Sequence, residues 1–345
     1  MAGTIFGLPF DEELFLQMWN EVPDPTLTAI LNSGAMVADS NIAGMIQNNG
    51  NLYTIPFYNP LDGDPSNHDG QTDITATEIN GAYQTGVVYG RDKAFAARDF
   101  AAELSGGDPM GHIAGTVGRY WAKQRQKELL GILEGVFSIT GSSGNAKLWQ
   151  DNNTADLSST TATPYTIGLT DANDLLTQAA GDNKSQFTLV IMHSQVAKTL
   201  ENAQLLEFWT QTDANGITRR LNLATYGGMT VIVDDGVPAT AVGGSEANKD
   251  LIKYTTYFLG GGALRQANAR LENPVETQRD PAKNGGMDIL YTRIRETIHP
   301  NGFSFTPPSS SWTQSPTRAQ LSAKANWSIV FNPKAIAMAR LITNG

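Results

Sequence analysis

The sequence predicts an α+β protein in which a small α/β lobe is inserted into a second lobe, and three observations indicate this. A polar, strand-like ribbon is followed by one helix of about 40 Å, after which helices and strands alternate before a β-rich portion closes the chain. The predicted organisation follows in chain order. It is an N-terminal arm at 1–49, an extended hairpin at 50–95, a first part with the long helix at 96–167, an inserted lobe at 168–268 and a β return at 269–345.

The composition is that of a folded protein that works without disulfides. The chain has 345 residues, and its 40% apolar content is enough for an ordinary core. It has neither a run of about 18 apolar residues nor the basic, apolar start of a secretion signal, so we expect synthesis and use in a cytoplasm, away from membranes. The absence of Cys excludes disulfides, thiolate metal sites and a cysteine nucleophile.

The charge is negative and unevenly distributed. A formal charge of −10 opposes non-specific attraction to nucleic acid. Residues 1–90 contain eleven Asp and Glu and no Lys or Arg, so the rest of the chain carries +1, the difference between −10 and −11. This acidic quarter is expected to meet a basic surface in the same chain or in another copy. The alternative is that it is simply solvated.

The N-terminal arm gives only short helical signals. In "DEELFLQMW", Asp11 can cap a helix whose apolar residues Leu14, Phe15, Met18 and Trp19 fall on one face. The pattern then breaks at "PDP". No compact core is visible before residue 50.

The segment 50–90 is expected to form a long hairpin. Its ends, "NLYTIPFYN" and "AYQTGVVYG", are strand-like, and the connector between them is rich in Asp, Gly, Pro and Asn. Each side offers up to ~20 residues, or on the order of 50 Å of reach. Because a lone two-stranded ribbon is marginal in water, we expect it to lie on a neighbouring subunit. Its contact residues would be the acids Asp62, Asp64, Asp69, Asp73 and Glu78.

A long helix is predicted from Pro109 to Phe137. Asp108 is placed to cap it, Pro109 suits the first helical position, and apolar residues recur at helical spacing up to Phe137. Its middle holds the basic residues Arg119, Lys123, Arg125 and Lys127. These are the expected counterpart of the acidic hairpin, so reversing charge at Arg119, Lys123 and Arg125 together should impair assembly and leave folding largely intact. The alternative is that they form a solvated helix face.

The remaining chain gives a coarse pattern. Residues 138–166 look loop-rich and are expected to separate the lobes. Next come a helix ending at Gly181, a buried strand "FTLVIMH", a helix from Ser194, and the strands "YGGMTVIVDD" and "YTTYFLGGG". Met287–Ile298 is predicted as one long strand, and the closing portion is expected to pack against the long helix.

No motif supports catalysis or a cofactor. Asp62, Asp64 and Asp73 occupy the first, third and twelfth places of a calcium-loop spacing, but Asn67 stands where Gly is required, so they are weak metal candidates. The four His are widely separated, and the Gly-rich stretches match no phosphate loop. Asp234 and Asp235 lie in an ordinary turn sequence. We therefore expect no enzyme and no cofactor.

The order of elements resembles the major capsid proteins of tailed bacteriophages, a fold shared with encapsulin shells and the herpesvirus capsid floor. The likeness is carried by "GRDKAFAARDFAAELSGGDPMGHIAGTVGRYWAKQRQKELLGILEGVF", "FTLVIMHSQVAKTLEN", "YGGMTVIVDD", "ETIHPNGFSF" and "WSIVFNPKAI". It implies an N-arm, an E-loop hairpin, a P-domain with a spine helix and an inserted A-domain. The implied function is a virion shell of hexamers and pentamers around double-stranded DNA, assembled in the host bacterial cytoplasm.

The resemblance also implies partners and leaves an alternative. Some members weld subunits through an E-loop lysine, but no Lys occurs between Gly50 and Gly90, so no such cross-link is expected. Non-covalent contacts or decoration proteins would then hold the shell, with separate scaffolding and portal proteins. Triangulation number, shell size and host are open. An encapsulin-type compartment filled with an enzyme is the alternative.

Overall fold

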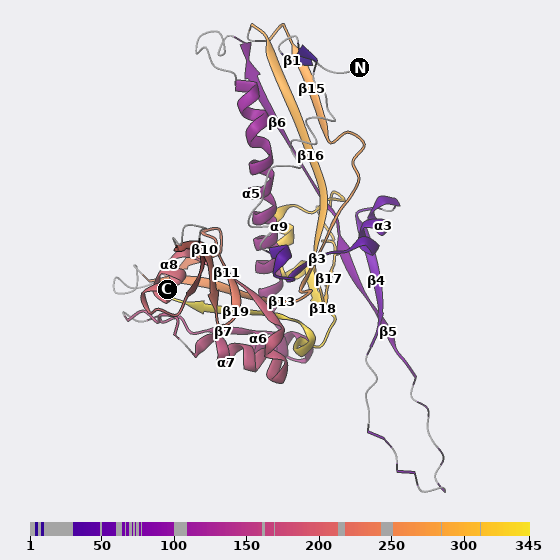
Figure 1. Ribbon diagram of the computed structural model, residues 1–345. Helices are drawn as coiled ribbons and strands as arrows, with labels where there is room; N and C mark the ends of the chain where they lie inside the picture. Colours follow the sequence, from indigo (N-terminus) through magenta and orange to yellow (C-terminus); the bar gives the residue numbers. More distant parts are fainter. Residues whose placement is uncertain are drawn as a thin grey trace.

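The computed structural model shows an elongated molecule with a compact lobe at one end of a long sheet and a ribbon leaving the body (Figure 1). The described residues are given by their ranges: 4–5, 8–9, 30–48, 50–59, 64–65, 67–68, 71, 73, 76, 78–99, 109–160, 163–168, 170–212, 218–242, 251–283, 285–310 and 312–345.

The predicted long helix is confirmed as α5, Pro109–Phe137, while its predicted cap Asp108 lies outside the described residues. Because apolar residues recur along one side, α5 buries that side against the five-stranded sheet. Trp121 is 3% exposed in this contact and donates its indole Nε1–H to the Thr292 hydroxyl at 3.1 Å.

The five-stranded sheet is organised around β16, Met287–Pro300, which confirms the predicted long strand. Its order is β15-β16-β14-β3, and β6 pairs with β16 beyond this path. The other strands are β3 (Met36–Ala38), β6 (Tyr89–Arg98), β14 (Leu264–Asn268) and β15 (Val275–Asp280). Strand β6 pairs with β16 from Met287↔Arg98 to Glu296↔Tyr89, so the strand that follows the hairpin is fixed beside α5.

The compact lobe contains an eight-stranded sheet of order β7-β19-β13-β8-β11-β10-β9, with β12 also pairing β13. Its strands are β7 (Thr154–Asp156), β8 (Phe187–Met192), β9 (Glu207–Thr212), β10 (Thr218–Tyr226), β11 (Met229–Val233), β12 (Ala239–Ala241), β13 (Ile252–Gly260) and β19 (Met338–Thr343).

Both faces of this sheet are covered. Side chains alternate along β8, so Leu189 joins the core around α5, whereas Val190 joins a second core with α7 (Asp171–Ala180) and α8 (Ser194–Asn202). The predicted helix end at Gly181 and helix start at Ser194 are confirmed.

The lobe differs from its predicted extent of 168–268 because β7 and β19 join its sheet from outside that range, whereas β14 belongs to the other sheet. The region 138–166, expected to be a loop, contains α6 (Gly144–Asn153). Its Trp149 is fully buried against Phe137, and this tertiary contact outweighs the weak helical propensity of a Gly- and Asn-rich segment.

The predicted hairpin is confirmed as an antiparallel pair of β4 (Leu52–Tyr58) and β5 (Gly81–Val87), with register from Leu52↔Val87 to Tyr58↔Gly81. Its paired part is seven residues a strand, shorter than the ~20 that the sequence allows. The connector from 60 to 77 lies only partly within the described residues.

The small elements complete the body. They are β1 (Thr4–Ile5), β2 (Leu8–Pro9), α3 (Ser40–Asn48), β17 (Phe303–Phe305), α9 (Arg318–Leu321), β18 (Trp327–Ile329) and 3-10 turns at Gly181–Gln186, Lys324–Asn326 and Pro333–Ala335. The helix predicted near Asp11 lies outside the described residues. Among the helices that are described, none combines the length and apolar character needed to span a bilayer.

Candidate functional site

The hairpin packs one face on the body, whereas its opposite face is buried at Val87 near the root and exposed towards the outer end of the strands. On the packed face, the ring of Phe57 meets that of Phe331 edge-on, with ring centroids 4.7 Å apart. Tyr53, also on this face, is 4% exposed, and its ring lies where a Cβ on Gly86 would stand. The opposite face carries Tyr58, which is 81% exposed. The ribbon is therefore anchored at its root and unsupported towards its tip.

The free edge of β4 contains a proline. Backbone bonds join Val88 to Asn51 and Asn59 to Asn80, so by antiparallel alternation the residues at even positions of β4 point their backbone groups away from β5. Pro56 is one of them and has no N–H to offer at that edge. This placement discourages another strand from pairing along the ribbon.

Buried hydrogen bonds fix the root of the ribbon to β16 and to the turn that follows it. The Tyr53 hydroxyl lies 2.9 Å from Thr297 Oγ1, whose own hydroxyl donates to the Val87 carbonyl at 2.8 Å. The Gln84 side-chain oxygen accepts from the Gly302 amide at 2.9 Å and lies 3.1 Å from His299 Nε2. Each bond joins residues more than 200 positions apart.

His299 is buried in its neutral form. Burial lowers its pKa to about 3, and the nearby Arg265 charge adds to this effect. Because an amide oxygen only accepts, the contact with Gln84 places the ring proton on Nε2. Within the described part of the chain, His299 Nδ1 is buried without a hydrogen-bond partner. A second proton on this ring would therefore be both buried and unpaired.

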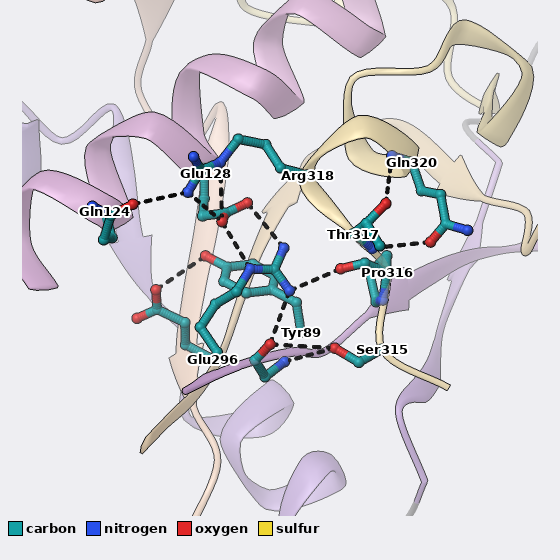
Figure 2. Close-up of polar contacts among 11 residues, drawn as sticks. Tyr89, Gln124, Glu128, Glu296, Ser315, Pro316, Thr317, Arg318 and Gln320 are labelled. Atoms are coloured by element: carbon teal, nitrogen blue, oxygen red, sulfur yellow. Dashed lines mark hydrogen bonds and ion pairs between the residues drawn. The ribbon is translucent and has the colours of Figure 1, made fainter. Parts of the chain in front are cut away.

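An ionic cluster holds the start of β6 to α5 (Figure 2). Glu128 of α5 is 1% exposed and receives two guanidinium groups. Arg91 binds it in a bidentate manner, with Nε–Oε1 at 2.9 Å and Nη2–Oε2 at 3.1 Å. Arg318 donates to Glu128 Oε1 from Nη2 at 2.9 Å, and its Nη2 also contacts Gln124 Oε1 at 3.1 Å. A buried carboxylate is tolerated because both cations compensate it.

A second buried carboxylate adjoins this cluster. Glu296 of β16 is 2% exposed and accepts from Arg125 Nε at 2.8 Å and from the Tyr89 hydroxyl at 3.1 Å. Burial raises the Tyr89 pKa well above its usual value, and the carboxylates Glu296 and Glu128 raise it further. Tyr89 therefore remains a proton donor to Glu296.

The segment before α9 straps the beginning of β6. The Gly90 amide donates to Ser315 Oγ at 3.0 Å, and Arg91 Nη1 donates to the Pro316 carbonyl at 2.8 Å. Thr317 and Gln320 form a capping box that starts α9 and so places Arg318 beside α5. Four parts of the chain thus set the direction in which the ribbon leaves the body. They are α5, β16 with the turn after it, the segment 315–318 and Phe331.

The predicted basic residues divide into two groups. Arg119, Lys123 and Lys127 are exposed, lie four residues apart on one face of α5, and have no ion pair to any residue that the structure describes. Arg125 differs, because it is committed to Glu296 of its own chain. We call the first three residues the basic row.

The predicted acidic residues lie on the ribbon's connector. Asp64, Asp73 and Glu78 are exposed, whereas Asp62 and Asp69 fall outside the described residues. Within the described ranges, no three or more His, Asp or Glu gather as a metal site.

The turn after β11 is structural. Asp234 Oδ1 accepts from the Gly236 amide at 2.8 Å, and Asp235 Oδ1 accepts from the Ser194 amide at 3.2 Å. The Ser194 hydroxyl and the Asp235 carboxylate both approach Nδ1 of His193, at 3.5 and 3.8 Å. A proton relay needs the two ring nitrogens to serve different partners, so this is not a nucleophile activated by a base.

Sequence reasoning missed the buried carboxylates. Glu128 lies seven residues after Trp121 and four before Ile132, so it continues the buried face of α5. The signal available in the sequence was the charged residue Glu128 on the apolar face of the long helix. It indicates a buried ion pair but not its partners, because Arg91 and Arg318 are distant in sequence.

Comparison with solved structures defines the class of fold. The capsid of Ralstonia phage GP4 matches with a TM-score of 0.53 and 11% identity, covering 77% of this chain and 82% of that one. The capsid asymmetric unit of cyanophage Pam1 matches with a TM-score of 0.51 and 12% identity, covering 88% and 87%. The chain thus has the fold of phage capsid subunits, as the sequence predicts.

Comparison with curated proteins defines the family. No protein-family model matches the sequence. The major capsid protein of Bacillus phage SPP1 is 32% identical over 314 residues, which cover 90% of this chain and 89% of that protein. The chain therefore belongs to the phage major capsid proteins. It is a structural subunit of a virion shell made of many copies.

Proposed function

We propose that this chain closes into an icosahedral shell of hexamers and pentamers by reaching from each copy to the next with its hairpin. The observation that carries the proposal is the ribbon itself, which is held at its root and exposes Tyr58 and Tyr83 at the outer end of one face. A two-stranded ribbon with an exposed aromatic face gains its remaining stability from a partner surface. The residues that hold its root orient it for that contact.

The acidic connector pairs with basic residues of another copy. The connector residues Asp64, Asp73 and Glu78 are exposed, and the basic row offers three exposed cations without a partner in the described part of its own chain. Exposed pairs of this kind contribute little energy individually but guide the approach and register of two subunits. Asp62 and Asp69 belong to the same proposal on sequence grounds.

The shell is held without covalent cross-links and encloses double-stranded DNA. No Lys stands between Gly50 and Gly90 to form an E-loop weld. An acidic subunit with a charge of −10 offers DNA little attraction, so the genome can enter without being held by the wall. Filling such a shell needs separate scaffolding and portal proteins, and decoration proteins can strengthen it.

Expression in a bacterial cytoplasm, alone and with a scaffolding protein, tests the proposal. We expect closed particles in electron micrographs, five- and six-fold clusters on their surface, and a single monomer band in denaturing electrophoresis. Covalent ladders would refute the non-covalent shell. A compact, soluble monomer under all these conditions would refute the shell function, and particles filled with an enzyme would favour the compartment alternative.

A further inference from the structure

The partly exposed face of the ribbon ends in an aromatic patch. Among the described residues, the three most exposed large hydrophobic side chains are Tyr58 at 81%, Tyr83 at 64% and Ile79 at 61%. Tyr58 pairs with Gly81 and Tyr83 with Pro56, so the two tyrosines lie diagonally on one face. Scattered apolar residues on a surface are ordinary, but a tyrosine cluster at the end of one ribbon marks a contact surface.

A hollow of about 500 Å³ lies at the C-terminal half of α5. Its apolar lining residues are Leu130 of α5, Pro238 after β11 and Ala319 of α9, and its lining also includes Gly131, Gly236, Ser322 and the charged residues Lys127, Glu134 and Arg318. Gly131 follows Lys127 by four residues and so continues the line of the basic row. Because glycine has no side chain, the row of side chains along α5 is interrupted at Gly131. A group from another molecule can therefore contact the apolar residues of the hollow at this point.

The ribbon and this surface match in the order of their chemistry. Outward along the ribbon, the tyrosines come first, then Glu78, and then the more distal Asp73. Along α5 towards its N-terminus, the hollow comes first, then Lys127, and then the rest of the basic row. In a single docking register, the tyrosines can therefore lie over the apolar residues of the hollow while Glu78 and Asp73 lie beside the cations of the basic row.

The occupant must come from a second copy. Strands β4 and β5 leave the body away from the compact lobe and from the C-terminal half of α5 (Figure 1). The root contacts of Tyr53 and Gln84 hold the ribbon in that direction. A chain whose ribbon fits a surface that its own ribbon cannot reach makes a head-to-tail contact with a second copy, and such contacts form a ring when the rotation between copies closes.

We propose that the aromatic patch of one copy, Tyr58 and Tyr83, seats in the hollow beside Lys127 of a second copy, with Glu78 at Lys127 and Asp73 towards Lys123. This inference rests on the proposed shell function and adds the acceptor surface and the direction of the contact. The hollow supplies apolar contact area, and the basic row supplies register.

Site-specific photocross-linking tests the contact directly. p-Benzoylphenylalanine replaces Tyr83 in a tenth of the subunits of particles made with wild-type chain. After irradiation, we expect the label on peptides of a second copy that contain 127–134, 236–238 or 318–322. Labelling confined to other peptides would overturn the acceptor assignment. If the wild-type chain forms no particles, it is the shell function that fails.

Filling the hollow is a second test. In Gly131→Leu the new Cβ meets only Arg318 Cγ, at an ordinary 3.6 Å, so the folded chain accommodates it while the side chain occupies the hollow. We expect at least a tenfold loss of particle yield, with a thermal stability of the unassembled chain no lower than that of wild type. Gly44→Leu in α3 is the matched control, because Gly44 is also helical, is exposed and has open space around it. Equal yields from both variants would refute the docking.

A charge exchange tests the register. Lys127→Glu and Glu78→Lys should each lower the yield several-fold, and their combination in one chain should restore it to within about twofold of wild type. Lys198→Glu, an exposed reversal on α8, should leave the yield unchanged. Absence of rescue in the double variant would overturn the assigned pairing, even where particles form normally from the wild-type chain.

Discussion

The buried imidazole of His299 should make the ribbon root sensitive to acid, and His299→Gln should remove this sensitivity. The pKa is about 3 in the folded chain and about 6.5 in the unfolded chain. The unfolded state therefore binds the proton first as the pH falls. Stability is unaffected above pH 6.5 and is lost progressively between 6.5 and 3.

The magnitude follows from this window. Each pH unit between the two pKa values costs about 1.4 kcal/mol, so the folded chain should lose about 2 kcal/mol at pH 5 and about 5 kcal/mol by pH 3 from this group alone. The physical reason is that a protonated ring would be buried near Arg265 with Nδ1 lacking an acceptor among the described residues.

Urea unfolding of the unassembled chain at pH 7.5 and pH 5 measures the effect. Other groups titrate as well, so the informative quantity is the difference between variants. Wild type should lose about 2 kcal/mol more than His299→Gln between these pH values. His112→Gln is the control, because His112 is exposed on α5, and it should behave as wild type. Equal losses for wild type and His299→Gln would refute the reasoning.

Three further predictions concern the root and the edge of the ribbon. Glu128→Gln should lower the free energy of unfolding by ~2–3 kcal/mol in urea titrations, because it removes the buried carboxylate that neutralises the partly exposed guanidinium groups of Arg91 and Arg318. Arg125→Glu should destabilise the unassembled chain by ~3–5 kcal/mol by stranding the buried carboxylate of Glu296, whereas Lys123→Glu should change its stability by less than about 0.5 kcal/mol. Pro56→Thr should restore an N–H at the open edge of β4 and increase irregular polymers in light scattering and electron micrographs.

One result would contradict each of these three predictions. A Glu128→Gln chain no less stable than Glu134→Gln, an exposed change on the same helix, would contradict the role of the cluster. Equal stabilities for Arg125→Glu and Lys123→Glu would contradict the separation of Arg125 from the basic row. A Pro56→Thr chain that stays as dispersed as wild type would contradict the protective role of Pro56.

Reversing Arg119, Lys123 and Arg125 together should impair folding as well as assembly, whereas the sequence alone led us to expect an effect on assembly with folding largely intact. The sequence places all three on one helix, and helical spacing alone does not show which of them turns inward. Arg125 neutralises a buried carboxylate, so its reversal acts on folding. Charge reversal at Arg119, Lys123 and Lys127 together should instead impair assembly and leave folding largely intact.

The elements that were predictable are those whose signal is local. The bounds of α5, the helix end at Gly181 and the long strand from Met287 follow from apolar spacing, capping and turn residues. The hairpin follows from two strand-like runs around a polar connector. The acidic and basic patches were likewise visible as composition.

What could not be predicted depends on pairing across long distances. Strand β19 joins the compact lobe through register with β13, and nothing in "MARLIT" distinguishes this sheet from the other. The partners of Glu128 come from residues 91 and 318, and the hydroxyl of Thr297 reaches the ribbon only because β16 aligns it there. Such sets are defined by the fold, and no local pattern identifies them.

The anchors of the ribbon also determine when it acquires its direction. Tyr53 and Gln84 emerge early in synthesis, but their partners near Thr297 and Gly302 are made more than 200 residues later. Chains grow from the N-terminus at about 5–20 residues per second, so the ribbon spends on the order of ten seconds or more without its final support. A subunit therefore becomes competent to engage its neighbours only after the segment that contains Thr297 and Gly302 has been made, which delays polymerisation on the ribosome.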